Sequence, residues 1–270
     1  MRIFYDVDTQ NDFMNKNGAL YVPDAELIKQ NLALLTNHAK QNHVLVLGSV
    51  DKHFGTEEYK HREGELKRWG GPFPDHCMEN ALGQLKINET TLVKSSGMFA
   101  DWMTQNENDY GLYIQHPLYH NWSKREIPNE VREARNGLTE EQIKNEWEEL
   151  INGIEEHSLL EAIREIKKVE LKQTQRGIYL EKQHFDVFAN PNTEELFERA
   201  RVSEAIVYGV ATDYCVKAAV LGMQKRGIQT YVVSDAIKGV FPESTKSALE
   251  EMANAGAKFV KTRYVLKGRI

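Results

Sequence analysis

At the start of the chain, short apolar runs of the kind found in buried strands alternate with amphipathic stretches. Residues Arg2 to Val7 are largely apolar, aromatic or β-branched, which predicts a first strand. Residues Ala25 to Lys40 repeat apolar positions with helical spacing, and His43 to Gly48 form a compact second strand. A strand, a helix and a strand in this order predict a βαβ unit, and therefore a parallel sheet.

The C-terminal part of the chain repeats the same alternation. Strands are predicted from Ile178 and over 205–208, 227–236 and 258–260, with helices over 194–200, 216–223 and 242–255. We therefore predict one α/β domain over residues 1–270. Its expected architecture is a three-layer α/β/α sandwich around a doubly wound, mainly parallel sheet.

The pattern changes between about residues 95 and 177. This segment is rich in charge, and Glu140 to Lys168 carries apolar residues at helical spacing. A structureless loop of this length is uncommon in a compact domain, so we predict a helical insertion. Its charges are most simply a solvated face; a cap over a site or an oligomer contact is the sharper alternative.

Composition narrows the class of protein. Apolar residues make up 41% of the chain and charged residues 27%, and the formal net charge is -6. A net negative charge disfavours nucleic acid and anionic membranes as partners. No apolar run approaches the ~20 residues of a spanning helix, and the N-terminus lacks the apolar stretch of a signal peptide. With only two cysteines, a reducing cytoplasm is the expected location.

One cysteine stands where a predicted strand turns into a predicted helix. The run Gly209 to Cys215 follows the apolar strand Ala205 to Tyr208 and precedes the helix from Val216. The unpaired N–H groups at a helix start favour a thiolate, which suits a nucleophile. A buried structural cysteine is the alternative, and this turn alone leaves both interpretations open.

Several polar side chains follow other predicted strands. Asp8 ends the first strand and Asp51 comes just after the second, so both lie at the carboxyl edge, where such sheets bind ligands. Asp51 and His53 are two residues apart and share one face of an extended chain. His61 and His76 follow and offer further ligands, and an aspartate with two histidines suits zinc, iron or manganese. Histidines that are merely solvated in a loop are the alternative.

Three motifs at strand ends, taken together, resemble the isochorismatase-like cysteine hydrolase superfamily, and within it the nicotinamidases. They are the run Asp8 to Phe13 (D-x-Q-x-D-F), the run Glu181 to Gln183 (E-K-Q), and the run Gly209 to Cys215 (G-V-A-T-D-Y-C). The resemblance covers roughly residues 1–94 and 178–260 and leaves out the insertion. It implies the three-layer fold and hydrolysis of a C–N bond.

By this resemblance, Asp8 is the general base, Lys182 its cationic partner and Cys215 the nucleophile. Lys94 lies nearer to His76 in the sequence, but it lacks the Asp-x-Phe that follows Lys182. A carboxylate and a cation beside a thiol suit attack on an amide, which gives a thioester and ammonia.

The resemblance also implies a cis peptide bond between Val210 and Ala211. The backbone N–H groups of Ala211 and Cys215 would then form an oxyanion hole. Phe13 and Phe73 are implied as substrate-binding residues; Phe73 stands where nicotinamidases commonly carry a tryptophan.

For the metal, the resemblance matches Asp51, His53 and His76, with the divalent ion holding the pyridine nitrogen of nicotinamide. His61 is a less convincing fourth ligand. The predicted reaction converts nicotinamide to nicotinate and ammonia. Hydrolysis of another small amide, such as a carbamoyl or ureido compound, is the alternative. A non-catalytic binding protein that uses the insertion as its partner surface is a third reading. Proteins of this kind often assemble, so a homo-oligomer is expected.

Overall fold

The computed structural model describes residues 1–91 and 177–270, together with residues 112–114 and scattered positions between 139 and 167. Its seven strands form one sheet in the order β3-β4-β2-β1-β5-β6-β7, and every neighbouring pair is parallel. The strands are β1 (Arg2–Val7), β2 (Val46–Asp51), β3 (Leu112–Ile114), β4 (Ile178–Lys182), β5 (Glu204–Val210), β6 (Gln229–Lys238) and β7 (Lys258–Val260).

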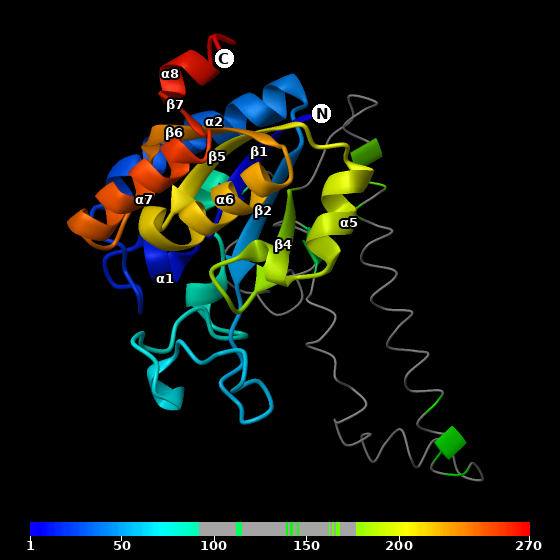
Figure 1. Cartoon of the computed structure of the whole chain (residues 1–270). Coiled ribbons are helices and arrows are strands. Elements are labelled where there is room, and N and C mark those ends of the chain that lie inside the picture. Colours follow the sequence, from blue (N-terminus) through cyan, green and yellow to red (C-terminus); the bar gives the residue numbers. More distant parts are fainter. Residues whose placement is uncertain are drawn as a thin grey trace.

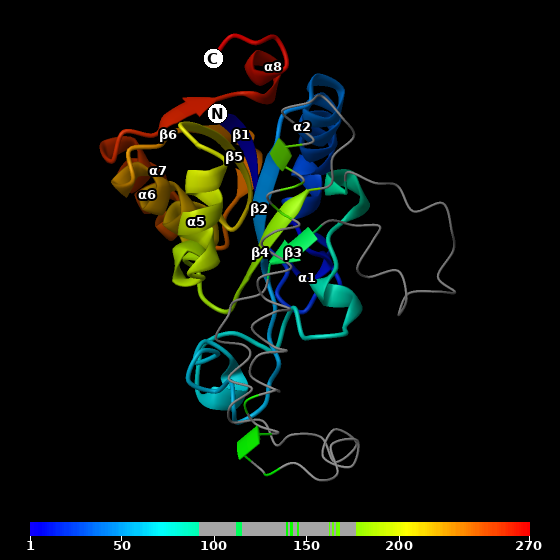
Figure 2. The ribbon, with the colours of Figure 1, turned by 90° about the vertical axis from the view of Figure 1, so that its right-hand side faces the viewer.

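Helices cover both faces of this sheet. Figure 2 shows α5, α6 and α7 on one side and α1 and α2 on the other. Short 3-10 helices lie in the connections, and one π-helical turn precedes α6. The α-helices are α1 (Asn11–Met14), α2 (Lys29–Asn42), α5 (Asn192–Arg199), α6 (Lys217–Lys225), α7 (Pro242–Asn254) and α8 (Thr262–Val265).

The side chains of the strands divide into two cores, one on each face. Tyr5 of β1 packs in a core that includes Phe197 of α5 and Met223 of α6. Its neighbour Phe4 packs in a second core with Leu32 of α2. Successive residues of a strand point to opposite faces, so a parallel sheet with helices on both sides needs apolar residues throughout. The predicted three-layer architecture is confirmed.

The order of the strands fixes where a ligand can bind. From β1 the chain moves outward through β2 to β4 and then returns to β5 on the other side of β1. In such sheets the crevice lies at the carboxyl ends of the strands where the direction reverses. In Figure 1 the loops between β2 and β4, drawn in cyan, extend beyond this edge.

The second strand begins later than the sequence pattern predicted. Helix α2 continues to Asn42, and His43 ends it in the left-handed conformation, with φ 51°. Strand β2 therefore runs from Val46 to Asp51 rather than from His43 to Gly48. The predicted strand overlaps β2, but its first residue, His43, belongs to the end of α2. Asp51 is thus the last residue of the strand rather than the first residue after it.

Most of the predicted insertion, residues 95–177, lies outside the described residues, as does Lys94. Residues 112–114 form β3, which pairs with β4 at the edge of the sheet, where the pattern had predicted only helices. Ala162 and Ile166 are helical, as predicted, and are buried in the core that contains α5 and α6.

No helix in the part of the chain that the structure describes combines the length and the apolar character that crossing a membrane requires.

Candidate active site

Asp8, Lys182 and Cys215 meet at the carboxyl edge of the sheet. Asp8 follows β1, Lys182 ends β4, and Cys215 lies in the turn after β5. The Nζ atom of Lys182 is 2.8 Å from Oδ2 of Asp8 and 3.3 Å from Sγ of Cys215. All three side chains are buried. Three residues from distant parts of the sequence therefore form one compact ionic group.

The backbone conformation of Asp8 directs its side chain toward this group. Its φ of 47° lies in the left-handed region, where aspartate is tolerated better than most residues. The N–H of Asp8 donates to the carbonyl of Ser49 at 3.1 Å, and the Ser49 hydroxyl donates to Oδ1 at 2.7 Å. One carboxylate oxygen is held by the serine, and the other faces the lysine.

The turn that carries Cys215 follows a tight approach between β5 and β1. Gly209 has φ 120°, and a Cβ at this position would lie 2.0 Å from the carbonyl oxygen of Val7, so only glycine fits. The peptide bond between Val210 and Ala211 is cis. The chain then forms a π-helical turn, Thr212–Val216, that leads into α6. This geometry places Cys215 at the end of the strand and the start of the helix.

The surroundings of Cys215 favour the thiol, whereas the helix start that follows it favours the thiolate. Burial raises the pKa of Cys215 well above its ordinary value; Lys182 lowers it, while Asp8 and Asp51 raise it further. Burial also raises the pKa of Asp8, against the opposing effect of Lys182. Two carboxylates and one ammonium leave the group with an excess of negative charge, which opposes a further anion. The thiol therefore needs a base when it reacts.

Asp51 joins this group to its neighbours. One oxygen of Asp51 accepts a hydrogen bond from Lys182, and both side chains are buried. Burial opposes the charged forms, but the contact with Lys182 holds the pKa of Asp51 well below its usual range. Burial likewise opposes the charge of Lys182, yet Asp51 and Asp8 raise the pKa of Lys182 well above its ordinary value. The lysine therefore stays charged.

Gln10 holds the backbone of Asp51 in place. Its amide oxygen accepts from the N–H of Asp51 and its amide nitrogen donates to the carbonyl of Asp51, both at 2.7 Å. The same nitrogen donates to the carbonyl of Gln84 at 2.7 Å. Because Gln10 is fully buried, these bonds have no competition from water. The glutamine of the D-x-Q-x-D-F motif thus ties β1 to the end of β2.

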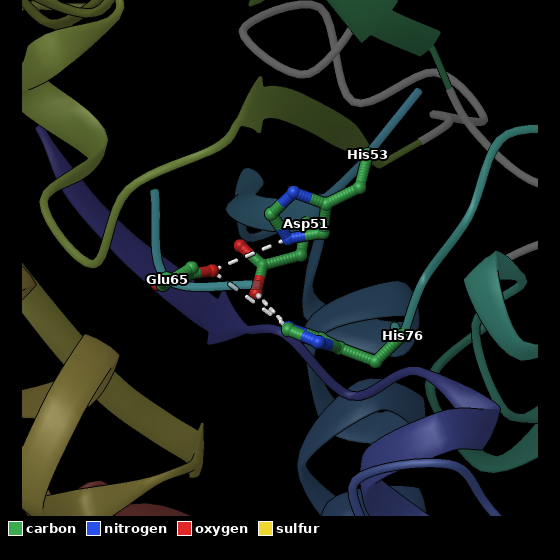
Figure 3. Close-up of side chains that lie close together, drawn as sticks. All are labelled: Asp51, His53, Glu65 and His76. Atoms are coloured by element: carbon green, nitrogen blue, oxygen red, sulfur yellow. Dashed lines mark ion pairs between the residues drawn. The ribbon is translucent and has the colours of Figure 1, made fainter. Parts of the chain in front are cut away.

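A second cluster lies beside Asp51 and consists of Asp51, His53, Glu65 and His76 (Figure 3). One ligand atom from each residue lies within 4.8 Å of all the others. Nε2 of His53 is 3.3 Å from Oε1 of Glu65, and Nε2 of His76 is 3.7 Å from Oδ2 of Asp51. Figure 3 shows the four side chains converging on one point. These residues can hold a metal ion.

The donor set fits a divalent transition ion. Both ring nitrogens of His53 are buried, and neither has a hydrogen-bond partner among the described residues, which is costly unless something else binds them. Nδ1 of His76 lies 2.8 Å from the carbonyl of Pro74, which leaves Nε2 for a metal. Glu63 stands 3.8 Å behind Nδ1 of His53 and accepts from the N–H of Gly55. A set of imidazole and carboxylate ligands suits zinc, iron or manganese.

Glu65 was not among the predicted ligands, whereas Asp51, His53 and His76 lie together as predicted. His61, the less convincing candidate, is exposed and stands outside the cluster. Glu65 lies in a stretch rich in charge and loop residues, where a solvated carboxylate is the ordinary expectation. Its only sequence signal is its place between the two histidines.

A pocket of about 380 Å³ opens onto both groups. Asp8 and Cys215 line it on one side, and Asp51, Glu65 and His76 line it on another. Its other lining residues are mostly apolar or aromatic: Phe13, Leu20, Val22, Phe73, Phe185, Val210, Ala211, Tyr214 and Val240. The thiol and the candidate metal ligands therefore face the same small space.

Aromatic rings form much of the pocket wall. The ring centroids of Phe13 and Phe73 lie 5.4 and 6.4 Å from that of His76, so both residues stand beside the candidate metal ligands. Both were predicted to bind substrate, and both line the pocket. Phe185 and Tyr214 complete the wall and were not predicted. Tyr214 lies within the G-V-A-T-D-Y-C motif, whereas nothing in the sequence around Phe185 sets it apart.

Comparison with known families identifies an isochorismatase domain over residues 162–263. This part of the chain is similar to the isochorismatase-like superfamily. This agrees with the resemblance that the three motifs indicated. The matched range includes Lys182 and Cys215, while Asp8 and the candidate metal ligands lie before it.

Two curated relatives are similar over part of the chain. The nicotinamidase of Escherichia coli (strain K12) is 43% identical over 58 residues, which are 21% of this chain and 27% of that protein. The nicotinamidase/pyrazinamidase of Mycobacterium tuberculosis (strain ATCC 25618 / H37Rv) is 34% identical over 95 residues, or 35% of this chain and 50% of that protein. The chain therefore matches half or less of the length of these relatives.

Solved structures share the fold over nearly the whole chain. The pyrazinamidase of Pyrococcus horikoshii, in complex with zinc, superposes with a TM-score of 0.59 at 20% identity. The alignment covers 96% of this chain and 98% of that protein. At this identity the likeness establishes the fold.

Proposed function

We propose that this protein is a metal-dependent cysteine amidohydrolase whose substrate is nicotinamide. The observation that carries the proposal is the position of Lys182, whose Nζ lies 2.8 Å from Asp8 and 3.3 Å from the sulfur of Cys215. Asp8 and Cys215 line a pocket that three residues of the metal-ligand cluster also line. The similarity to nicotinamidases from two organisms supports the choice of substrate.

The arrangement suits attack by a neutral thiol with base assistance. As Sγ of Cys215 forms a bond to the amide carbon, Asp8 accepts the thiol proton. Lys182 offsets the negative charge that develops in the resulting tetrahedral intermediate. Asp8 then returns the proton to the departing nitrogen, the C–N bond breaks, and ammonia leaves behind a thioester. Water, deprotonated by Asp8, cleaves the thioester to the carboxylic acid and restores the thiol.

The backbone around the cis bond is proposed to help at the oxygen of the amide. The N–H groups of Ala211 and Cys215 are the donors implied for an oxyanion hole. Val210, Ala211 and Cys215 all line the pocket. Preorganised backbone donors stabilise a developing oxyanion by ~3 kcal/mol. The thiol and its oxyanion donors would then come from one turn of the chain.

Asp51, His53, Glu65 and His76 are the residues that would hold the metal. A bound divalent ion would supply a Lewis acid that anchors a basic ring nitrogen and so orients the substrate. Asp51 contributes one oxygen to this cluster and the other to Lys182. It therefore fixes the distance between the anchor and the reacting group.

The direct test is release of ammonia from nicotinamide. We expect the purified wild-type protein to release ammonia and nicotinate, and the Cys215→Ala variant to release neither. Cys77, which is also buried but does not line the pocket, offers the matched control Cys77→Ala, which should stay active. If the wild type instead hydrolyses only carbamoyl or ureido compounds in a panel of amides, the nicotinamide assignment is wrong while the hydrolase assignment stands.

Removal of the metal tests the cluster separately. Dialysis against a chelator should abolish hydrolysis of nicotinamide, and zinc, manganese or iron should restore it. Glu65→Ala should lower zinc affinity about 100-fold, measured by competition with a chromophoric chelator. Glu58, an exposed acid of the same loop, provides the control variant Glu58→Ala. Equal affinity in the two variants would exclude Glu65 as a ligand.

A further inference from the structure

Phe185 lies at the pocket although no motif contains it. It stands three residues beyond Lys182, in the loop that follows β4, and lines the same pocket as Cys215. Its residue surface is 37% exposed, which is unusual for a phenylalanine beside a buried catalytic group. An apolar ring that borders a cavity and still meets water gains stability when a ligand covers it.

Phe185 is the outer member of a wall of three rings. Its centroid lies 6.2 Å from that of Phe73, with an interplanar angle of 83°, and 5.1 Å from that of Tyr214, at 56°. Phe73 and Tyr214 are 5.5 Å apart at 85°. These are the tilted and edge-to-face contacts that aromatic pairs prefer. Each ring supports the other two, so the wall presents a defined surface.

The loop that carries Phe185 is anchored on both sides. Gln183 donates from its side-chain amide to the carbonyl of Lys52 at 2.7 Å. Asp186 accepts from the N–H of Phe188 at 2.9 Å and caps the short helix Val187–Ala189. The two residues that flank His184 and Phe185 are therefore fixed. Phe185 is held over the pocket by this loop rather than by deep burial of its own side chain.

We propose that Phe185 is a specificity-determining residue that selects amides of flat aromatic rings, an inference that rests on the proposed hydrolase function. Its ring contacts the face or edge of a substrate ring whose amide points to Cys215. The three rings of the wall carry no charge, whereas the acidic residues that line the pocket belong to the Cys215 group or to the metal-ligand cluster. Aliphatic amides, which have no ring, cannot cover this wall, so contact with it does not strengthen their binding.

The kinetic test uses substitutions of Phe185 that differ in how much apolar area they keep and in whether they keep a ring. For nicotinamide, Phe185→Ala should raise KM about tenfold and leave kcat within twofold, because it removes contact made equally in the ground state and the transition state. Phe185→Leu, which keeps apolar area without a ring, should give an intermediate KM, and Phe185→Trp should keep KM near the wild-type value. The control is Phe259→Ala, because Phe259 is also 37% exposed but lies on β7, away from the pocket.

The result that would overturn the proposal is a KM for Phe185→Ala no higher than that of Phe259→Ala. A fall in kcat at unchanged KM would also overturn it, since Phe185 would then position the Lys182 loop rather than contact the substrate.

A binding measurement separates this inference from the proposed function. Nicotinamide, benzamide and propionamide are titrated calorimetrically into Cys215→Ala, with and without Phe185→Ala. The added substitution should weaken binding of the two ring amides about tenfold and leave propionamide unchanged. Should the wild type release no ammonia, the proposed function fails, yet these titrations still decide the role of Phe185. Equal loss for all three amides, or no loss, would refute it.

Discussion

Two buried lysines pair with acids near the end of β1, Lys86 with Asp6 and Lys182 with Asp8, yet their surroundings differ. Lys182 lies among Asp8, Asp51 and Cys215 at the carboxyl edge of the sheet. Lys86 lies 2.9 Å from Asp6, and its ammonium stands 4.4 Å from the centre of the Tyr179 ring. Both lysines are buried, so burial of a charged pair does not by itself mark a catalytic group.

The difference lies in charge balance and access. The Lys86 group holds one carboxylate and the hydroxyl of Thr9, which accepts from the ammonium at 2.8 Å, so its charges cancel. It does not contribute to the described pocket, and it ties the segment around Thr90 to the sheet through a 2.7 Å hydrogen bond with Thr9. The Lys182 group has two carboxylates, one ammonium and a thiol that faces a pocket. A carboxylate that can accept the proton of an accessible thiol, with a cation beside both, makes a reactive site, and a neutral pair holds a loop in place.

The largest expected effect is a loss of activity on substitution of Lys182 that substitution of Lys86 does not cause. Lys182→Met should lower kcat/KM for nicotinamide about 10³-fold, because no other cation in the group can offset the developing negative charge. The measurement is steady-state ammonia release, normalised to the folded fraction from circular dichroism. Lys86→Met is the comparison and should stay within twofold of the wild type per folded molecule. A loss below tenfold in Lys182→Met would contradict the role given to Lys182.

The next effect concerns stability at the Lys86 group. Lys86→Met leaves Asp6 buried without its cation and should lower the free energy of unfolding by about 3 kcal/mol, measured by urea titration. Burial already raises the pKa of Asp6, even with the lysine present to lower it. The double variant Asp6→Asn with Lys86→Met removes both charges and should recover part of the loss. If it is less stable than the single variant, the pair is not the source of the effect.

The smallest effect is the pH dependence of thiol reactivity. Because the pKa of Cys215 is raised well above its ordinary value, alkylation by iodoacetamide at pH 8 should be about tenfold slower than for a cysteine in a peptide. The rate should keep rising above pH 9, where the free thiol, with a pKa of ~8.5, levels off.

The same measurement distinguishes the lysines once more. Lys182 lowers the pKa of Cys215, so Lys182→Met should move the reactivity curve to higher pH, whereas Lys86→Met should leave it in place. Peptide mass spectrometry reports Cys215 separately from Cys77. A curve that shifts equally in both variants would mean that the local charge balance does not control the thiol.

The sequence by itself determined the architecture and most of the reactive residues. Periodicity located all the major strands outside residues 95–177, because parallel strands buried on both faces are apolar throughout. Residues at the ends of such strands meet at one edge, and the resemblance of the three motifs to isochorismatase-like hydrolases selected Asp8, Lys182 and Cys215 among them. The proximity of Asp51 and His53 follows from the same edge and from their two-residue spacing, whereas His76 was added to them by the resemblance to nicotinamidases. Gly209, the glycine before the turn, is the first residue of the G-V-A-T-D-Y-C motif, so the sequence indicated it as well.

Only the tertiary structure shows which residues far apart in the sequence lie close together in space. Glu65 faces the histidines only because the loop after β2 folds back, and a carboxylate in a charged loop otherwise looks solvated. Phe185 lines the pocket because Gln183 and Asp186 anchor its loop. The protonation of Cys215 depends on burial and on two carboxylates together, and neither can be summed from local sequence. Periodicity reports which face of an element is buried; it carries no information about which charges meet there.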